Sequence, residues 1–182
     1  SYFNGTFDGQ MHTISGIYSV ATYGNGLFGY PVATIKNLSL MDSYIQGGEG
    51  TGGIAGWYAE GTYHTLYSNA IVKAYSGASK NHAGGLFALT TGAATTVTNC
   101  WFDGEVIGAK YVGGMTSFNS TAVTFTDCLS TGTVKSTITT NSNSNYSHAG
   151  GFVGYANANV TLVDCVEAGS VTGYGYTGTT IG

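Results

Sequence analysis

Hydrophobic and polar positions alternate in short stretches that recur along the chain. In Thr34-Ile35-Lys36 and again in Thr124-Phe125-Thr126, one apolar residue stands between two polar ones, shortly before an Asn or Asp. A period of two residues is typical of a strand with one buried face and one solvent face. We therefore expect one short, half-buried strand in each copy of the pattern. The apolar positions of this column are Ile35, Tyr67, Val97, Phe125 and Leu162.

The Asn or Asp that follows each stretch interrupts the alternation, because the residue after it is again apolar or small. Asn and Asp tolerate the left-handed backbone conformation and bond to nearby backbone groups, so they suit a tight corner between two strands. A row of metal-binding carboxylates is the alternative, but three of the five side chains are amides. We predict a structural corner column of Asn37, Asn69, Asn99, Asp127 and Asp164.

Glycine pairs recur at a variable spacing that averages roughly 30 residues, at Gly52-Gly53, Gly84-Gly85, Gly113-Gly114 and Gly150-Gly151, with a looser copy at 26–29. An apolar residue follows each copy and gives a further buried column. A period of roughly 30 residues indicates stacked repeats that bury their apolar faces only against one another. The sequence thus predicts an all-β fold, a right-handed parallel β-helix (β-solenoid) of about five turns with three short strands in each turn.

The repeats also suggest how the chain is organised. We expect a single β-solenoid domain over 1–182, with lead-in strands or a cap at 1–25, about five repeats over 26–176 and the start of a further, truncated repeat at 177–182. Because the chain opens at Ser1 and closes within a partial copy, we expect it to be a fragment of a larger protein that continues into further domains.

Composition excludes several classes of partner. Charged residues make up 8% of the chain, the net charge is -4, and the five basic residues are all Lys. Nucleic-acid binding is not expected, because phosphate contacts require clustered basic side chains. Membrane insertion is not expected either, since no apolar stretch approaches the length that a membrane helix needs. A β-rich extracellular protein fits these values best.

The stretch from Gly150 to Val171 contains a motif in three parts. It begins with a glycine pair, two apolar residues and a further glycine, continues with an apolar-x-Asp-Cys string, and ends with Gly-x-Val. This arrangement resembles the GLUG-motif repeat of large bacterial surface proteins, and the copies from Gly84 and from Gly113 also resemble it. Ala88 and Thr116-Ser117 depart from the motif. The resemblance implies a β-solenoid region of an adhesin, or the non-catalytic part of a surface enzyme such as an immunoglobulin-A-specific metallopeptidase, secreted or at the bacterial cell surface. It transfers no catalytic residue.

The candidate chemistry of Cys and His is modest. Cys100, Cys128 and Cys165 share a column with the core residues Leu38 and Ala70, so we expect buried free thiols, with one disulfide between neighbouring turns as the alternative. No Cys-x-x-Cys or paired-His motif occurs, so we expect no metal site and no cofactor. His82 and His148 are expected two turns apart, at the solvent edge of a loop.

The carboxylates do not form a catalytic constellation in the sequence. Asp103 and Glu105 are the closest pair and could share a face, as the acids of a glycosidase must. Arg is absent, and Lys110 and Lys135 are isolated, so nothing stabilises the anion that a lyase reaction develops. We therefore expect that this chain is not an enzyme. A carbohydrate-active β-helix enzyme of the polysaccharide lyase or hydrolase type is the alternative.

Aromatic residues give the candidate binding surface. A column four residues after the glycine step places Tyr30, Trp57 and Tyr155 in equivalent positions, together with Leu89 and Phe118. Flat aromatic faces stack on sugar rings, although large aromatics are more often buried between strands. The predicted ligand-binding residues are Trp57, Tyr58, Tyr30, Tyr155 and Trp101.

The most suitable function is therefore a non-catalytic extracellular adhesion or spacer module of a bacterial cell-surface protein, with a glycan or a host surface protein as partner. Ice binding is a second alternative, because Thr96-x-Thr98 and Thr124-x-Thr126 form Thr-x-Thr pairs on adjacent turns. Lys36 and Val163 break that pattern in the outer turns, and the ordinary β-propensity of Thr explains it better.

Overall fold

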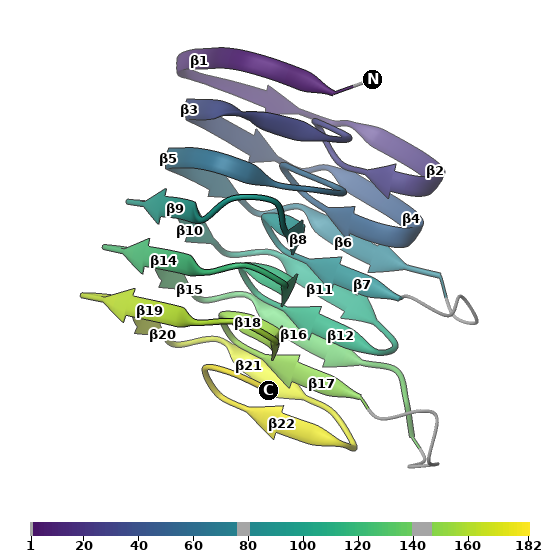
Figure 1. Cartoon of the computed structure of the whole chain (residues 1–182). Coiled ribbons are helices and arrows are strands. Elements are labelled where there is room, and N and C mark those ends of the chain that lie inside the picture. The colour runs from purple at the N-terminus through teal and green to yellow at the C-terminus, as the bar shows by residue number, and fades with distance from the viewer. Residues whose placement is uncertain (1, 76–80, 140–146) are drawn as a thin grey trace.

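The computed structural model describes residues 2–75, 81–139 and 147–182, and these residues form strands and turns without any helix. Figure 1 shows the strands stacked side by side from the N-terminus to the C-terminus. Every registered pair is parallel, and strands of the inner repeats pair with equivalents one repeat earlier and one repeat later in the chain, as β11 does with β6 and β16. No helix of the described residues is long and apolar enough to cross a membrane.

The strands belong to three sheets of nine, ten and three strands. The nine-stranded sheet contains β1 (Phe3–Ser15), β3 (Pro31–Met41), β5 (Glu60–Ser68), β9 (Thr95–Thr98), β10 (Trp101–Phe102), β14 (Val123–Thr126), β15 (Leu129–Ser130), β19 (Val160–Val163) and β20 (Val166–Glu167). The ten-stranded sheet contains β2 (Tyr18–Asn25), β4 (Tyr44–Gly52), β6 (Ile71–Ala74), β7 (His82–Gly84), β11 (Glu105–Gly108), β12 (Tyr111–Gly113), β16 (Thr133–Ser136), β17 (His148–Gly150), β21 (Ser170–Thr172) and β22 (Tyr176–Gly178). The three-stranded sheet contains β8 (Phe87–Thr90), β13 (Thr116–Asn119) and β18 (Val153–Ala156).

The prediction of a right-handed parallel β-helix of about five turns is wrong, although the all-β class and the parallel pairing are as expected. The parallel sheets form a half-barrel and a nearly closed barrel. The early repeats do not contain three short strands, because β1, β3 and β5 continue through left-handed residues, among them the expected corner Asn37 of β3, as strands of 13, 11 and 9 residues. Beyond the corner the same sheet divides, since β5 pairs with both β9 and β10.

The core lies between the sheets and is built from columns of apolar side chains in register. Ile35 lies beside Tyr63, Tyr63 beside Val97, and Val97 beside Phe125. All four side chains are fully buried. The single hydroxyl proton of Tyr63 has two acceptors within reach, the carbonyl oxygens of Glu60 and Pro31 at 3.2 and 3.4 Å, and burial raises the pKa of this phenol well above its usual range. A buried tyrosine is thus accommodated because its polar end has partners.

The corner column differs from the sequence expectation in the second repeat. Asn37, Asn99, Asp127 and Asp164 have left-handed backbones, with φ between 50° and 56°. Asn69 does not, and Thr65, with φ 55°, takes the corner instead. The register confirms the exchange, since Lys36 and Leu38 pair with His64 and Leu66 on either side of Thr65.

Two stretches of the second repeat fit the same corner pattern, and this explains why the sequence predicts Asn69 at the corner whereas the structure has Thr65 there. Tyr63-His64-Thr65-Leu66 and Tyr67-Ser68-Asn69-Ala70 each have an aromatic residue two positions before a polar corner candidate. Burial decides between them. Tyr63 is fully buried, whereas Tyr67 is partly exposed and lies beside Trp101.

A threonine at this corner is strained, because β-branched residues rarely adopt a left-handed backbone. We expect Thr65→Asn to raise the free energy of unfolding by about 1 kcal/mol, since Asn tolerates this conformation. The Asn side-chain oxygen can still accept the hydrogen bond that Asn99 Nδ2 donates to Thr65 Oγ1. Urea denaturation measures the change. Thr62→Asn, on the same strand outside the corner, is the control, and an equal effect there would contradict the interpretation.

The first corner also sets the ionisation of Asp8. Asn37 Nδ2 and the Gln10 backbone N–H both donate to Asp8 Oδ1 at 2.9 Å, and Lys36 Nζ lies 3.2 Å from Oδ2. These contacts lower the pKa of Asp8 to about 2, with the Asn37 hydrogen bond as the largest cause. Because the folded pKa is depressed, the stabilisation is present above the unfolded pKa and is lost as the pH falls toward 2.

We expect an NMR titration to find the Asp8 pKa near 2, and Asn37→Gly to raise it toward the ordinary value of 3.8. Glycine retains the left-handed backbone while removing the amide donor. Lys36→Gln should raise the pKa less, because each of the two effects of Lys36, its hydrogen bond and its charge, is smaller than the effect of the Asn37 amide. The reverse order of the two variants would show that the ion pair, not the corner amide, controls this carboxylate.

Candidate functional site

Ten rings form a continuous contact path across the strands, which we call the aromatic stripe. Successive ring centroids along the path lie 4.7–6.2 Å apart. Such separations are those of interacting aromatic pairs. The stripe consists of Tyr2, Tyr30, Tyr58, Trp57, His82, Tyr111, Phe118, Tyr155, His148 and Tyr176.

Strand register aligns the C-terminal part of the stripe. Tyr111 of β12 pairs with His82 of β7 on one side and with His148 of β17 on the other. A second row lies in the three-stranded sheet, where Phe118 pairs with Leu89 and Tyr155, as their shared sequence column predicts. The rings meet because in-register residues of parallel strands project from the same face.

Glycines form the floor beneath the N-terminal part of the stripe. Tyr30 lies against Gly24, where an added Cβ would approach the ring to 2.9 Å. Trp57 lies against Gly50, where an added Cβ would overlap the six-membered ring of the indole. Both glycines also have left-handed backbones, with φ 58° and 73°. The two aromatic rings therefore rest on bare backbone, which fixes their positions.

The rings around Trp57 are arranged differently from those of the C-terminal part of the stripe, although Tyr30 and Tyr58 also stack, with centroids 6.0 Å apart and an interplanar angle of 27°. Tyr155 stacks on Tyr111 and on Phe118 with interplanar angles of 17° and 13°, so these ring faces cover one another. Trp57 instead meets Tyr58 and His82 at 74° and 86°. Tyr58 is 39% exposed, and Tyr30 and Trp57 are partly exposed. Tyr30, Trp57 and Tyr58, which we call the ring platform, are the part of the stripe best suited to stack on a ligand.

The two histidines of the stripe lie in different surroundings. Burial, followed by the nearby Lys110 ammonium, lowers the pKa of His148, so its imidazole is neutral. Lys110 Nζ lies 5.4 Å from the centroid of the Tyr111 ring. His82 is 5% exposed, so the expected position at a solvent edge is wrong. Tyr111 separates the two imidazoles, as the predicted spacing of two strands requires.

Trp101 lies apart from the stripe, on β10 of the nine-stranded sheet. Its ring contacts Tyr67 at 4.9 Å, and its Nε1 donates a 2.8 Å hydrogen bond to Thr131 Oγ1. Thr131 in turn donates to Asp103 Oδ1 at 2.6 Å. The structure therefore brings Tyr30, Trp57, Tyr58 and Tyr155 onto one stripe and places Trp101 in a second cluster, which also engages Asp103 of the Asp103/Glu105 pair.

A ladder of threonines crosses the nine-stranded sheet, and sequence reasoning found only part of it. The six residues are registered on successive strands and are all exposed or partly exposed. The threonine ladder consists of Thr6, Thr34, Thr62, Thr96, Thr124 and Thr161. Because the sequence pattern predicts Tyr67 in the buried column, it predicts Leu66, the residue before Tyr67, in this row, whereas the structure places Thr62 there.

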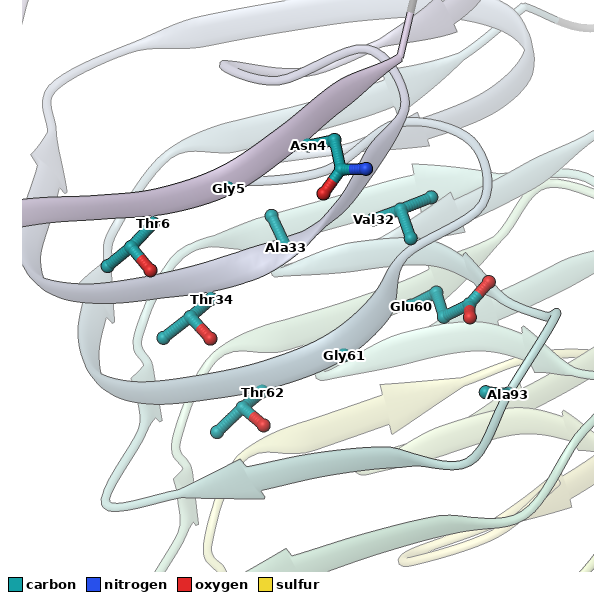
Figure 2. A pocket seen from close by; sticks show the side chains of 10 residues that line it. All are labelled: Asn4, Gly5, Thr6, Val32, Ala33, Thr34, Glu60, Gly61, Thr62 and Ala93. Carbon is teal, nitrogen blue, oxygen red and sulfur yellow. The ribbon is translucent and has the colours of Figure 1, made fainter.

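Figure 2 shows Thr6, Thr34 and Thr62 one above another along an open groove of about 370 Å³. Asn4 and Glu60 also line this groove. The column two residues further along is mixed, because it contains Asp8, Lys36 and His64 before Thr98 and Thr126. The face therefore has one regular row of hydroxyl groups instead of two.

The cysteines and carboxylates form no centre that could hold a metal ion in the described part of the chain. Cys100 and Cys128 are buried and Cys165 is partly buried, all three as free thiols. Burial raises the pKa of Cys100 well above its usual value. A thiol with a raised pKa remains protonated and is a poor nucleophile, so Cys100 behaves as a core residue.

Comparison with known proteins supports the fold. No protein-family model matches the chain, and no curated protein matches it significantly. Among solved structures, the chain is similar to a Bacteroides ovatus protein named "putative immunoglobulin A1 protease", with a TM-score of 0.59 and 17% sequence identity. The similarity covers 96% of this chain and 66% of that chain. An identity this low shows a shared fold alone. The name of this neighbour is consistent with the association with immunoglobulin A proteases that the GLUG resemblance implies. No family model matches a GLUG motif in the chain.

Proposed function

We propose that this chain is a non-catalytic, extracellular binding module of a bacterial cell-surface protein, and that it recognises a glycan through the ring platform. The observation that carries this proposal is the arrangement of Tyr30, Trp57 and Tyr58 as three contacting, partly exposed rings on a glycine floor. The GLUG resemblance supports the cellular location, either secreted or at the bacterial surface.

The chemistry of the platform suits a sugar. One face of a pyranose ring carries mainly C–H groups, which pack against an aromatic face, while phenol hydroxyls can hydrogen-bond to the sugar hydroxyls. The platform continues along the stripe across several strands, so a glycan chain could contact more than one part of it. Weak contacts made by consecutive sugars add up when a rigid surface presents them together.

We expect the purified protein to bind one or more members of a glycan and mucin array, and Trp57→Ala to weaken that binding at least about tenfold. Removal of a central aromatic side chain from an interface costs more than about 1.4 kcal/mol, which corresponds to this factor. Trp101→Ala is the matched control, because it removes the same side chain from a different cluster and should retain binding.

Two outcomes would contradict the proposal. If Trp57→Ala retains glycan binding and Trp101→Ala loses it, the glycan binds at the Tyr67–Trp101 cluster instead of the ring platform. Silence across the array, with both variants folded as judged by circular dichroism, would leave a spacer or a module for a protein ligand as the better account.

The threonine ladder favours ice binding as a second candidate function. Six in-register threonines repeat at the spacing of neighbouring strands, about 4.8 Å, and present methyl and hydroxyl groups at regular intervals. A regular row of such groups could order water in a lattice. The mixed second column weakens this candidate relative to glycan binding.

If the ladder binds ice, the protein inhibits ice recrystallisation and Thr96→Tyr abolishes this activity, because a large ring in the middle of the row interrupts its regularity. Tyrosine is well tolerated in exposed strand positions, so the fold should persist. Thr133→Tyr, an exposed position on β16 of the other large sheet, is the control. Equal ice growth with and without the unmodified protein would exclude this function.

A further inference from the structure

A groove runs along the corner between the nine-stranded and ten-stranded sheets, at the N-terminal end of the molecule. It has a volume of about 420 Å³ and is formed where β1 turns into β2, β3 into β4, and β5 into β6. None of the residues discussed as glycan ligands contributes to it. The corner groove is lined by Gly16, Ile17, Tyr18, Asp42, Ser43, Tyr44, Asn69 and Ile71.

One wall of the corner groove is aromatic and apolar. Tyr18 and Tyr44 are in register on β2 and β4, and their rings stack at 5.4 Å with an interplanar angle of 12°. Ile71 follows in the same column on β6. Tyr18 and Ile71 are 76% and 40% exposed, which leaves large apolar surfaces open to solvent. The Tyr44 hydroxyl donates to Gln46 Oε1 at 2.7 Å, which helps to fix its ring.

The corner groove is also lined by Asp42, whose carboxylate is oriented by hydrogen bonds. The Asp42 backbone N–H donates to Asn69 Oδ1 at 2.7 Å, and Asn69 Nδ2 donates to Asp42 Oδ1 at 3.3 Å. This reciprocal pair holds Asp42 in a left-handed conformation, with φ 47°. Among the described residues, nothing donates a hydrogen bond to Asp42 Oδ2. Asn69, expected at a strand corner, instead positions this carboxylate.

No basic side chain lines the corner groove. Among the described residues, the ion pair that is found joins Lys36 to Asp8. Asp42 therefore forms no ion pair with a described lysine. An unpaired carboxylate beside stacked aromatic rings is complementary to an organic cation.

We propose that the corner groove binds the guanidinium group of an arginine side chain presented by a partner protein. A planar guanidinium packs against the exposed surface of the Tyr18/Tyr44 wall and donates to the carboxylate of Asp42, while its methylene stem packs on Ile71. Arginine suits this site better than lysine, because its planar cation both stacks on aromatic faces and donates several hydrogen bonds in one plane. The inference does not depend on glycan recognition, which uses a separate surface.

An NMR titration tests this inference with three acetylated, amidated Gly-Xaa-Gly tripeptides, where Xaa is arginine, lysine or citrulline. The arginine peptide should cause saturable shifts of the Asp42, Tyr44 and Ile71 signals. Citrulline has nearly the same shape without the charge, and it should bind at least about tenfold more weakly, as expected when one charge-assisted contact is lost. The lysine peptide should be intermediate, and added salt should weaken the binding of both cations.

Asp42→Asn removes the charge and retains a residue that tolerates the left-handed backbone, so it should reduce arginine-peptide affinity at least about tenfold in a folded protein. Asp103→Asn is the matched control and should bind the peptide normally. Equal binding of the citrulline peptide, unchanged affinity in Asp42→Asn, shifts confined to other surfaces, or no saturable shift at all would each overturn the assignment. The same titration on the Trp57→Ala variant distinguishes the corner groove from the ring platform, because this variant should still bind the arginine peptide in the corner groove.

Discussion

Registered stacking of parallel strands is the constraint on which this structure depends. Neighbouring strands lie about 4.8 Å apart, so each side chain is placed directly beside its equivalent in the next repeat. In the core this leaves little space where backbone segments converge. A Cβ on Gly85 would overlap both the Gly114 carbonyl oxygen and the Phe102 ring, and one on Gly114 would overlap the Gly151 carbonyl oxygen. The glycine pairs therefore recur because larger residues would separate adjacent repeats.

The same constraint produces the surface features. Once the core column fixes the register, every exposed position must also form a row across the strands. A row of threonines gives a hydroxyl ladder, rows of aromatic residues give the stripe, and corner residues of successive repeats line the corner groove. Possible binding surfaces in such a fold are thus extended and run perpendicular to the strands, whereas a compact catalytic cleft needs residues from several directions.

The sequence predicts the strands better than it predicts how they join. Alternation located β9 and β14 correctly, because their buried residues Val97 and Phe125 lie between polar neighbours, and β19 follows the same column with Leu162, which is partly buried. It could not show that β3 continues through Asn37, because a left-handed residue can bend a strand or end it, and pairing with distant residues decides the outcome. Tyr63 and Tyr67 were indistinguishable for the same reason, since only burial in the folded sheet separates them.

The sequence predicts those features of the candidate site that depend on equivalent positions in successive repeats. It does not predict the features that depend on contacts between non-equivalent positions. The equivalence of Leu89, Phe118 and Tyr155 follows from repeat spacing, and strand register reproduces it. The separation of Trp101 from Trp57 does not follow, because both tryptophans occur in similar aromatic surroundings in the sequence. Likewise, Asn69 resembles the other corner amides, yet it orients Asp42 through a reciprocal hydrogen-bonded pair. A residue displaced from the corner column is therefore free to support a carboxylate, and a break in an otherwise regular repeat becomes the place where a specific site can form.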